Sequence, residues 1–552
     1  MVANATAVVR VCDQLIAELC GETVKDVYHV LACKGQQTLD GVIRLSQLPK
    51  ATVRSALLVL LQHSFVTSQL VQPEASLKGT PSPFFLYTAD TSAVLQILRW
   101  PWLLHHIAKE YRESPEDKDT DVLAVKIVQA LLEHGKLRTD QINSVVAALQ
   151  GSEATALGDA IVTCLGNLVQ SRYVQRARGC DAEKPQRPLP ATVKIRGAGS
   201  KSGTMEKAKI EAQAARSLAE TSYQDQRFSL PPGFLSGPTG SKGRTLPVSG
   251  TKRRKVEAKA EASKAQSDTI LWMVNMEECN KKLRQALCVE HTEGTHGEQA
   301  GALAAALLKA GQKPGSADPV DESWPVAGAD AAVTLSKMRS TDPGLPVLKQ
   351  DAAVKLLREL AENDSCCIES RGMAGLQDKL FVLNYKKGLD TLRQRHIEAI
   401  VRERFTIVGM RVFRMLLAKK QLEQKQIADF AMVPVREARE VLYKMLQGGF
   451  LALQDLPRSA DHAANRTIFT WHIDMVAVRR RVASELVHSI GNLRSRMEHE
   501  VSRRAELMMM MDMNVELSDQ EMKEGQKLSR IVNLMQIRTL ALDSHLLLFE
   551  AA

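Results

Sequence analysis

Residues Arg411–Ile473, RVFRMLLAKKQLEQKQIADFAMVPVREAREVLYKMLQGGFLALQDLPRSADHAANRTIFTWHI, contain the pattern that decides the fold. The piece VFRMLLAKK predicts a helix, QLEQ a short extended segment, and KQIADFA a second helix. After a break at MVP, the apolar residues of VREAREVLYKMLQGG recur at helical spacing and predict a third helix. FLALQDL and RTIFTWHI, separated by the polar loop PRSADHAAN, are typical of a two-stranded hairpin.

Tyr28–Thr88 repeats the same order of elements near the N-terminus. An apolar stretch ends at Gly35, a helix follows QQTLD, and Pro49 precedes the amphipathic helix ATVRSALLVLLQHS, after which FVTSQLV and FFLYTA predict a hairpin. A further copy is expected in Asp121–Ala177, and another uses DAAVKLLRELAEN with the hairpin CCIES and KLFVLNY. Three helices with a two-stranded wing form the winged-helix plan, a variant of helix-turn-helix.

We therefore predict a mainly α-helical fold with small β wings, in which tandem winged-helix domains precede an α-helical coiled coil. In the C-terminal part, apolar residues at spacings of three and four predict two helices that fold back as an antiparallel hairpin. The third domain is expected to draw early helices from ILWMVNMEECNKKLRQAL. The predicted domains are winged helix 1 (1–90), winged helix 2 (91–178), a linker (179–267), winged helix 3 (268–392, with a loose insertion at about 290–346 that contains one short helix around Gly301–Ala310), winged helix 4 (393–474) and the coiled coil (475–552).

The linker carries nearly all of the chain's net charge of +10. Gly179–Ser267 contains 17 Lys or Arg and 8 Asp or Glu, a net charge of +9, and is rich in Pro, Gly, Ser and Ala. We expect it to be disordered, because it has too little apolar content for a core. Within it, Lys252, Arg253, Arg254 and Lys255 form a candidate nuclear-import signal, with a solvated charge run as the alternative.

The residues that a catalytic or metal site would need are not found in any recognisable pattern. The chain has no phosphate-binding glycine loop, no zinc-protease or deaminase motif and no nucleophile elbow. None of the nine cysteines forms a C-x-x-C pair, so we predict free thiols, no metal and no cofactor. Apolar runs such as Ala56–Leu61 are far shorter than the ~18 residues that indicate a membrane span.

Basic residues on the third helix of a winged helix are candidates for DNA contact, because that helix can enter the major groove. Lys50 and Arg54 occupy these positions in the first copy, and Arg436, Arg439 and Lys444 occupy them in the last. The alternative is that these residues are ordinary solvated faces, since Glu437 and Glu440 reduce the local charge. No helix has the Arg, Asn and Gln set of direct base readout, so we expect contact without strong sequence preference.

The last copy also resembles one family of proteins closely. EQKQIADFAM, LYKML and the loop DHAANRT before an aromatic strand are similar, as a set, to the fourth winged helix in the family of the third-largest RNA polymerase III subunit. QTLDGVIRLSQLPKATVRSALLVLLQHSFV resembles the first winged helix of that family. The linker and the segment at about 290–346 match no part of it that we can place.

The resemblance implies a non-catalytic, nuclear subunit that lies on the clamp side of the polymerase III core with two partner subunits. It implies a role in recruiting the enzyme to a promoter-bound transcription factor and in opening DNA for short untranslated RNAs, with contact to single-stranded or melted DNA. Two other hypotheses remain open. The chain could be a free winged-helix regulator that binds specific DNA, or a scaffold whose winged helices contact only proteins.

Overall fold

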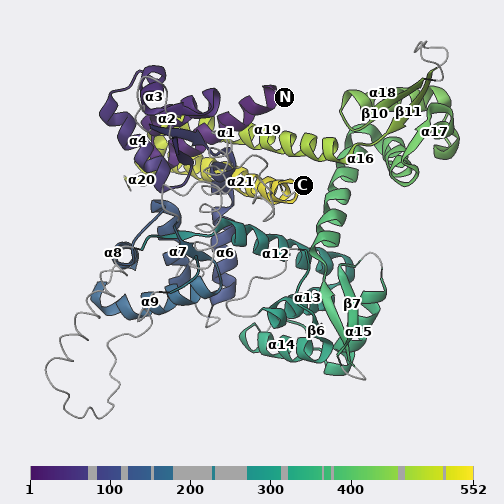
Figure 1. Cartoon of the computed structure of the whole chain (residues 1–552), viewed down its shortest axis with the longest axis horizontal. Helices are drawn as coiled ribbons and strands as arrows, with labels where there is room; N and C mark the ends of the chain where they lie inside the picture. The colour runs from purple at the N-terminus through teal and green to yellow at the C-terminus, as the bar shows by residue number, and fades with distance from the viewer. Residues whose placement is uncertain are drawn as a thin grey trace, which may run out of the picture. The chain divides into compact units, whose positions relative to one another are not determined.

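The computed structural model describes residues 2–71, 84–112, 122–150, 154–177, 227–230, 270–312, 321–342, 344–363, 366–374, 378–457, 467–513 and 518–550. These residues form two compact units, one built mainly from residues 9–281 and the other mainly from residues 282–552. Figure 1 shows the helices and strands of the chain with their labels. None of the helices in the described ranges combines the length and the apolar character needed to cross a bilayer.

The first unit begins with a winged helix that follows the predicted order. Thr38 caps its second helix by accepting a hydrogen bond from the backbone N–H of Gly41 (3.2 Å), and its third helix starts directly after Pro49. In the three-stranded sheet, the second wing strand (Phe84–Ala89) lies between the short strand Gln37–Thr38 and the first wing strand (Val66–Val71). The elements are α1 (Val2–Cys20), α2 (Glu22–Lys34), β1 (Gln37–Thr38), α3 (Leu39–Ser46), α4 (Lys50–Gln62), β2 (Val66–Val71) and β3 (Phe84–Ala89).

A second winged helix completes this unit, and its wing differs from the prediction. The strand Trp272–Val274, which we grouped with the third domain, pairs antiparallel with Val174–Arg176. Trp272 also exchanges backbone hydrogen bonds with Leu137 (3.1 and 2.7 Å) and is fully buried. The elements are α5 (Thr91–Leu95), η1 (Gln96–Arg99), α6 (Trp100–Tyr111), α7 (Leu123–His134), α8 (Thr139–Gln150), α9 (Ala154–Gln170), β4 (Val174–Arg176) and β5 (Trp272–Val274).

A short piece of the predicted linker packs on this second winged helix. The backbone N–H of Arg176 donates to the carbonyl of Arg227 (3.0 Å), and the Arg227 guanidinium donates to Asn275 (3.1 Å) and Glu277 (2.9 Å). Phe228 beside it packs against the apolar core of the domain. The prediction of disorder is therefore wrong for residues 227–230, and the remainder of 179–267 lies outside the described residues.

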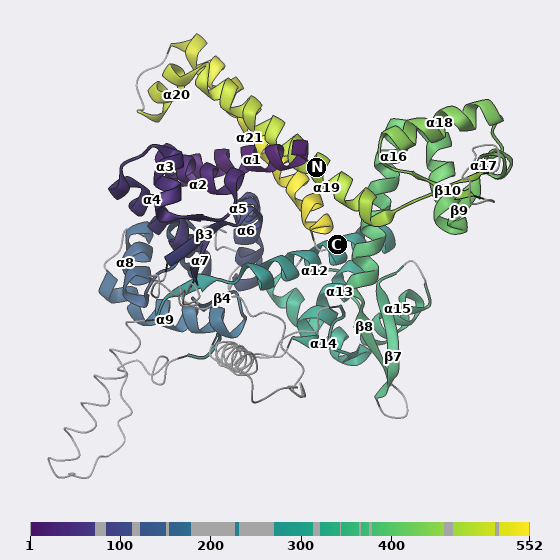
Figure 2. The same ribbon diagram turned by 45° about the horizontal axis from the view of Figure 1, so that its top comes forward.

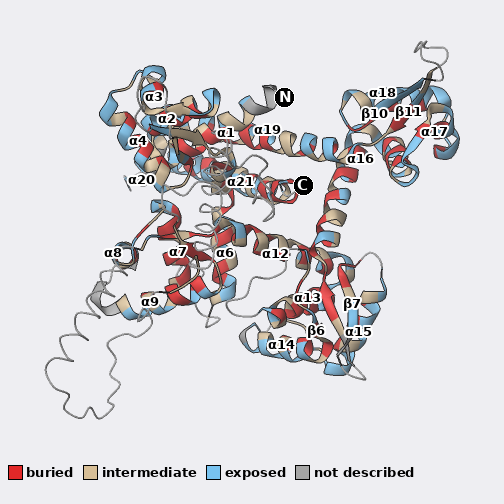
Figure 3. Ribbon diagram, viewed as in Figure 1, coloured by how far each residue is buried: buried red, intermediate tan, exposed pale blue. Residues whose placement is uncertain are grey.

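The other unit starts with a third winged helix, in which the predicted loose insertion at about 290–346 contains the expected short helix around Gly301–Ala310 and further helical residues on both sides of it. Gly297, with φ at 92°, separates α12 from α13. A Cβ on Gly301 would lie 2.6 Å from the Cβ of Glu293, so the glycine permits these two helices to approach closely. The elements are α12 (Met276–His296), α13 (Glu298–Gly311), β6 (Val326–Ala327), α14 (Gly328–Thr341), α15 (Gln350–Glu362), β7 (Ile368–Ala374) and β8 (Asp378–Leu383). Figure 3 shows the buried face of α13 in red.

The fourth winged helix follows on the long helix α16 and agrees with the pattern in its sequence. Glu423 and Gln426 form a capping box at the start of its second helix, and Met432 in the left-handed region ends that helix before Pro434. The strand order, β10-β11-β9, repeats that of the first and third domains. The elements are α16 (Tyr385–Lys419), β9 (Gln421–Glu423), α17 (Gln424–Ala431), α18 (Val435–Gln447), β10 (Ala452–Pro457) and β11 (Thr467–His472).

The C-terminal part is a helical hairpin, as predicted, in which α19 (Met475–Ser502) and α21 (Asp519–Phe549) pack along each other and α20 (Ala505–Asp512) lies between them in sequence (Figure 2). The carbonyls in the last turn of α21 accept hydrogen bonds from two arginines, Arg393 to Leu548 (2.5 Å) and Arg284 to Leu547 (3.4 Å). Cations at this end of a helix also interact favourably with its dipole. The coiled-coil assignment of the seam stays a prediction.

Candidate nucleic-acid interface

The five predicted contact residues all lie on the outward faces of third helices. Lys50 and Arg54 are exposed on α4, and Arg436, Arg439 and Lys444 are exposed on α18. The opposite faces are buried, by Val53, Leu57 and Leu60 in α4 and by Ala438, Leu442 and Met445 in α18. The amphipathic pattern of each helix therefore turns its basic residues toward solvent.

The outward face of α4 is basic and contains no acidic residue. Lys50 is the first residue of the helix, where the preceding Pro49 supplies no side-chain cap. A cation at this end opposes the helix dipole, so Lys50 does not stabilise the helix, whereas an anion bound there would be favoured. Arg54 lies one turn further along the helix, close to Tyr87 of the wing. Burial raises the pKa of Tyr87, and the charge of Arg54 offsets part of that rise. The α4 face can therefore receive a phosphate.

The outward face of α18 is only partly available for an anion. Lys444 forms an ion pair with Glu440 one turn before it (2.8 Å). The hydrogen bond and charge of Lys444, followed by the charge of Arg436, hold the pKa of Glu440 below its ordinary value. Arg439 is exposed, and the described part of the chain places no carboxylate within ion-pair distance of it. Arg439 is thus the α18 candidate with the least internal neutralisation.

Four large apolar side chains of α17, α18 and the turn between them are also exposed, and none of them is among the predicted contact residues. Met432 is 89% exposed, and Phe430, Val435 and Tyr443 are also exposed. We call Phe430, Met432, Val435 and Tyr443 the α17–α18 apolar patch. Val435, Arg439 and Tyr443 recur every four residues along one face of α18, which is a spacing that the sequence already contains. Exposed aromatic, Met and Arg side chains are enriched in the cores of protein interfaces, so this face is also suited to a protein partner.

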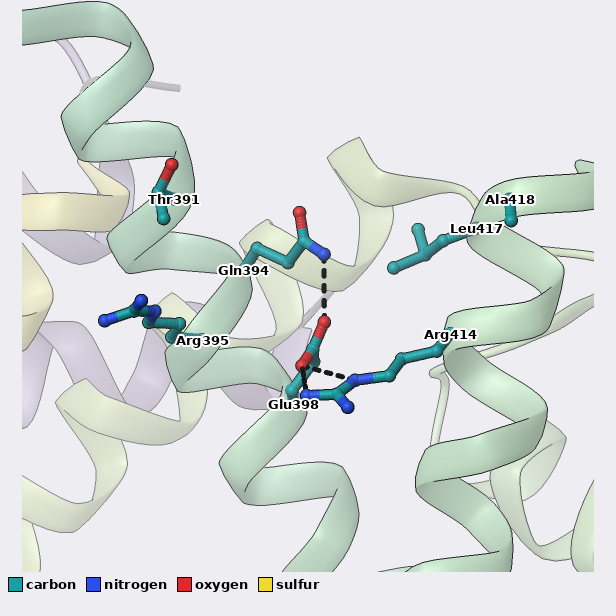
Figure 4. A pocket seen from close by; sticks show the side chains of 7 residues that line it. All are labelled: Thr391, Gln394, Arg395, Glu398, Arg414, Leu417 and Ala418. Carbon is teal, nitrogen blue, oxygen red and sulfur yellow. Dashed lines mark hydrogen bonds and ion pairs between the residues drawn. The ribbon is translucent and has the colours of Figure 1, made fainter. Parts of the chain in front are cut away.

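A second basic surface, outside the predicted contact residues, lies where α16 bends. Thr406 has φ at 67° and ψ at −176°, which breaks the helix into two arms. A hollow of about 670 Å³ lies between the arms and is lined by Thr391, Gln394, Arg395, Glu398, Arg414, Leu417 and Ala418 (Figure 4). At its centre Glu398, 7% exposed, accepts hydrogen bonds from Arg414 (2.6 and 2.8 Å) and Gln394 (2.9 Å). The Glu398–Arg414 ion pair joins the two arms of α16 across the bend.

The import candidate and the expected absence of a metal site are the remaining predictions from the sequence. The import candidate Lys252–Lys255 lies outside the described residues. Within the described residues, no three His, Cys, Asp or Glu side chains are grouped as metal ligands would be.

Three family profiles match separate parts of the chain. The profile described as "RNA polymerase III subunit RPC82 helix-turn-helix domain" matches residues 10–68, and that described as "RNA polymerase III subunit RPC82" matches residues 164–343. The profile described as "POLR3C, C-terminal winged-helix domain" matches residues 397–473, which comprise α16 from Ile397 onward and the rest of the fourth winged helix.

Similar proteins extend these matches to most of the chain. The DNA-directed RNA polymerase III subunit RPC3 of Danio rerio is 24% identical over 507 residues, 91% of this chain and 86% of its own. The RPC3 proteins of Bos taurus and Homo sapiens are each 25% identical, over the same shares of the two chains. Four winged helices in the order observed here, matched along nearly the whole length, place this chain in the RPC3 (RPC82) family of RNA polymerase III subunits.

Proposed function

We propose that the chain is a non-catalytic subunit of nuclear RNA polymerase III that helps to recruit the enzyme to promoter-bound factors and to open DNA during initiation of short untranslated RNAs. The observation that supports this most strongly is the match to RPC3 proteins over 91% of the chain. In this proposal the chain lies on the clamp side of the polymerase core with two partner subunits and a promoter-bound transcription factor. Its contribution is binding and positioning.

The proposed DNA contact is independent of sequence and involves single-stranded or melted DNA. The exposed basic residues of α4 and the exposed Arg436 and Arg439 of α18 support it, since arginine and lysine bind phosphates without reading bases. The α4 face lacks acidic residues, whereas the α18 face combines two arginines with the α17–α18 apolar patch. We therefore propose α4 as the more purely electrostatic DNA contact and α18 as a face shared with protein.

A transcription assay on two templates tests the proposed role in DNA opening. Nuclear extract is depleted of the chain, and short-RNA synthesis is measured on a closed promoter and on the same promoter with a melted start site. We expect depletion to abolish synthesis on the closed template, and the melted template to restore part of it. Adding the purified chain with its associated subunits should restore both.

The same assay separates recruitment from opening. If depletion removes synthesis equally from both templates while polymerase remains bound at the promoter, opening is not the function. If synthesis on the closed template is unchanged, the chain is dispensable for initiation and the proposal fails.

A further inference from the structure

The helix α16 carries a dense run of arginines that the third helices do not explain. Between Arg393 and Arg414 it contains six arginines and two glutamates. Three of the six have carboxylate partners: Arg393 with Asp390 (2.9 Å), Arg404 with Glu485 (2.6 and 3.1 Å) and Arg414 with Glu398 (2.6 Å). These three join α16 to itself and to α19, so their role is structural.

The other three, Arg395, Arg402 and Arg411, are exposed, and no carboxylate of the described chain lies within ion-pair distance of them. Arg395 and Arg402 are seven residues apart, which places them two turns and about 10.5 Å apart along one side of the helix. Unpaired like charges on one side of a helix repel each other and do not stabilise the fold. Their arrangement therefore points to an external anion.

Both arginines border the hollow at the bend of α16. Arg395 lines the hollow of about 670 Å³, and both line the adjoining one of about 530 Å³ with Arg414, Glu398, Glu403, Ala399 and Met410. Figure 4 shows that Arg395 extends away from the Glu398–Arg414 pair. The one buried acid is thus neutralised by Arg414, which leaves Glu403 as the acidic side chain that faces Arg395 and Arg402 in this lining.

The chemistry of this surface favours nucleic acid over a protein partner. No aromatic side chain lines either hollow, and the apolar lining is limited to Leu417, Ala418, Ala399 and Met410. A protein interface core is enriched in aromatic residues, whereas guanidinium groups suit a phosphodiester backbone, because they match phosphate oxygens with two parallel hydrogen bonds. We propose that the bend of α16 binds the phosphodiester backbone of nucleic acid, with Arg395 and Arg402 as its contacts.

This site lies outside the third helices, and its test does not depend on the proposed role in the polymerase. The purified full chain is titrated with a fluorescein-labelled oligothymidylate of about 25 nucleotides, and binding is followed by anisotropy at several salt concentrations. We expect Arg395→Glu with Arg402→Glu to raise Kd about tenfold at low salt, because two phosphate contacts are replaced by repulsion. For Arg395→Ala with Arg402→Ala we expect a smaller rise and a salt slope that is shallower by about 1.4, or 0.7 per contact.

Arg530→Glu with Arg538→Glu is the matched control, because both residues are exposed on α21 and the pair makes the same change in net charge. We expect it to leave Kd within about twofold. Equal weakening by the control would show that only overall charge matters and would overturn the proposal. If the Glu and the Ala double variants of Arg395 and Arg402 both bind the oligonucleotide as the unchanged chain does, the proposal is overturned as well. If these variants also lose a protein that co-purifies with the unchanged chain, the surface binds a protein and not nucleic acid. Circular dichroism confirms that each variant is folded.

Discussion

At the scale of single residues, the three basic side chains on the outward face of α18 have different electrostatic surroundings. Arg436 lies within the field of Glu440, and Lys444 is paired with it, whereas Arg439 has no carboxylate partner in the described chain. The sequence could predict that all five candidates are exposed, because the helical period alone decides that. It could not predict which of them are neutralised, since that depends on side-chain rotamers.

We predict that Arg436→Ala together with Arg439→Ala weakens the chain's binding to duplex or melted DNA uniformly across sequences. Each arginine that contacts a phosphate releases a counterion, so the double variant should also shift the salt slope by about 1 to 2 toward zero. Binding isotherms at several salt concentrations measure both quantities. Lys444→Ala is the control and should have the smaller effect, because its charge is compensated by Glu440. An unaltered slope in the double variant would remove α18 from the DNA interface.

His545, near the docked end of α21, contacts His396 of α16, and His291 acts electrostatically on His396. The rings of His396 on α16 and His545 on α21 lie 4.1 Å apart. Burial first, and then the charges of His545 and of His291 on α12, lower the pKa of His396 to about 4, and burial lowers the pKa of His545. In the unfolded chain these rings bind protons near pH 6.5, so between about pH 6.5 and 4 the unfolded state binds more protons.

We therefore predict that α21 is held most firmly above pH 6.5 and loses about 2–3 kcal/mol of local stability as the pH falls toward 4. Hydrogen exchange of the last turns of α21, corrected for the intrinsic rate, measures this loss. His396→Gln should flatten the dependence, whereas His488→Gln, at an exposed position on α19, should not. The same pH dependence in both variants would exclude His396 as its source.

At the scale of elements, the approach of α12 to α13 depends on one glycine. A Cβ at Gly301 would lie 2.6 Å from the Cβ of Glu293 and 3.1 Å from its Cα. We predict that Gly301→Val destabilises the third winged helix by about 1–3 kcal/mol, because overpacking displaces backbone. Urea unfolding followed through hydrogen exchange of α13 measures the change.

Gly294 is the matched control on α12, since a Cβ there meets no atom within 4 Å. We expect Gly294→Ala to raise stability by about 0.4–1 kcal/mol through the unfolded state. A neutral Gly301→Val variant would mean that the two helices are not in close contact in solution.

Elements were predictable where local periodicity decides them and not where distant packing does. The helices and hairpins of the first and fourth winged helices follow from their apolar spacing and from Pro49 and Pro434. The strand Trp272–Val274 was misplaced because its partner strand precedes it by almost a hundred residues, and three residues carry little periodicity. The segment at about 290–346 is predicted to be loose, apart from one short helix around Gly301–Ala310, because it contains many glycines and prolines. In the structure Gly301 instead permits α13 to pack closely on α12.

The proposed role of the basic run Lys252–Lys255 in nuclear import can be tested by substitution. We predict that changing Lys252, Arg253, Arg254 and Lys255 to Ala leaves a fluorescently tagged chain in the cytosol, because the run would no longer be bound by an import receptor. Fluorescence microscopy measures the nuclear fraction. Changing Lys184, Arg187, Lys194 and Arg196 to Ala removes the same charge from the same linker and should leave the chain nuclear. An unchanged nuclear signal in the first variant would mean that the chain enters with its partners.

At the scale of the whole molecule, four winged helices share one sheet plan. In three of them the short first strand pairs with the last wing strand, and in the second domain the bridge between Leu137 and Trp272 takes the place of that pairing. The repeated plan presents several outward third helices on one chain, together with the helical hairpin at its end. Several exposed helix faces on one chain are compatible with the proposed contacts to the polymerase, a promoter factor and DNA.

The central claim, that the chain works within RNA polymerase III, is tested most directly by affinity purification of the tagged full chain from nuclear extract, with the co-purified proteins identified by mass spectrometry. We predict recovery of the polymerase III core subunits with two further subunits, in stable stoichiometry and after a nuclease treatment that removes DNA bridges. If the chain is folded and no polymerase III subunit is recovered, that claim is contradicted, and a free regulator or a protein scaffold becomes the better explanation.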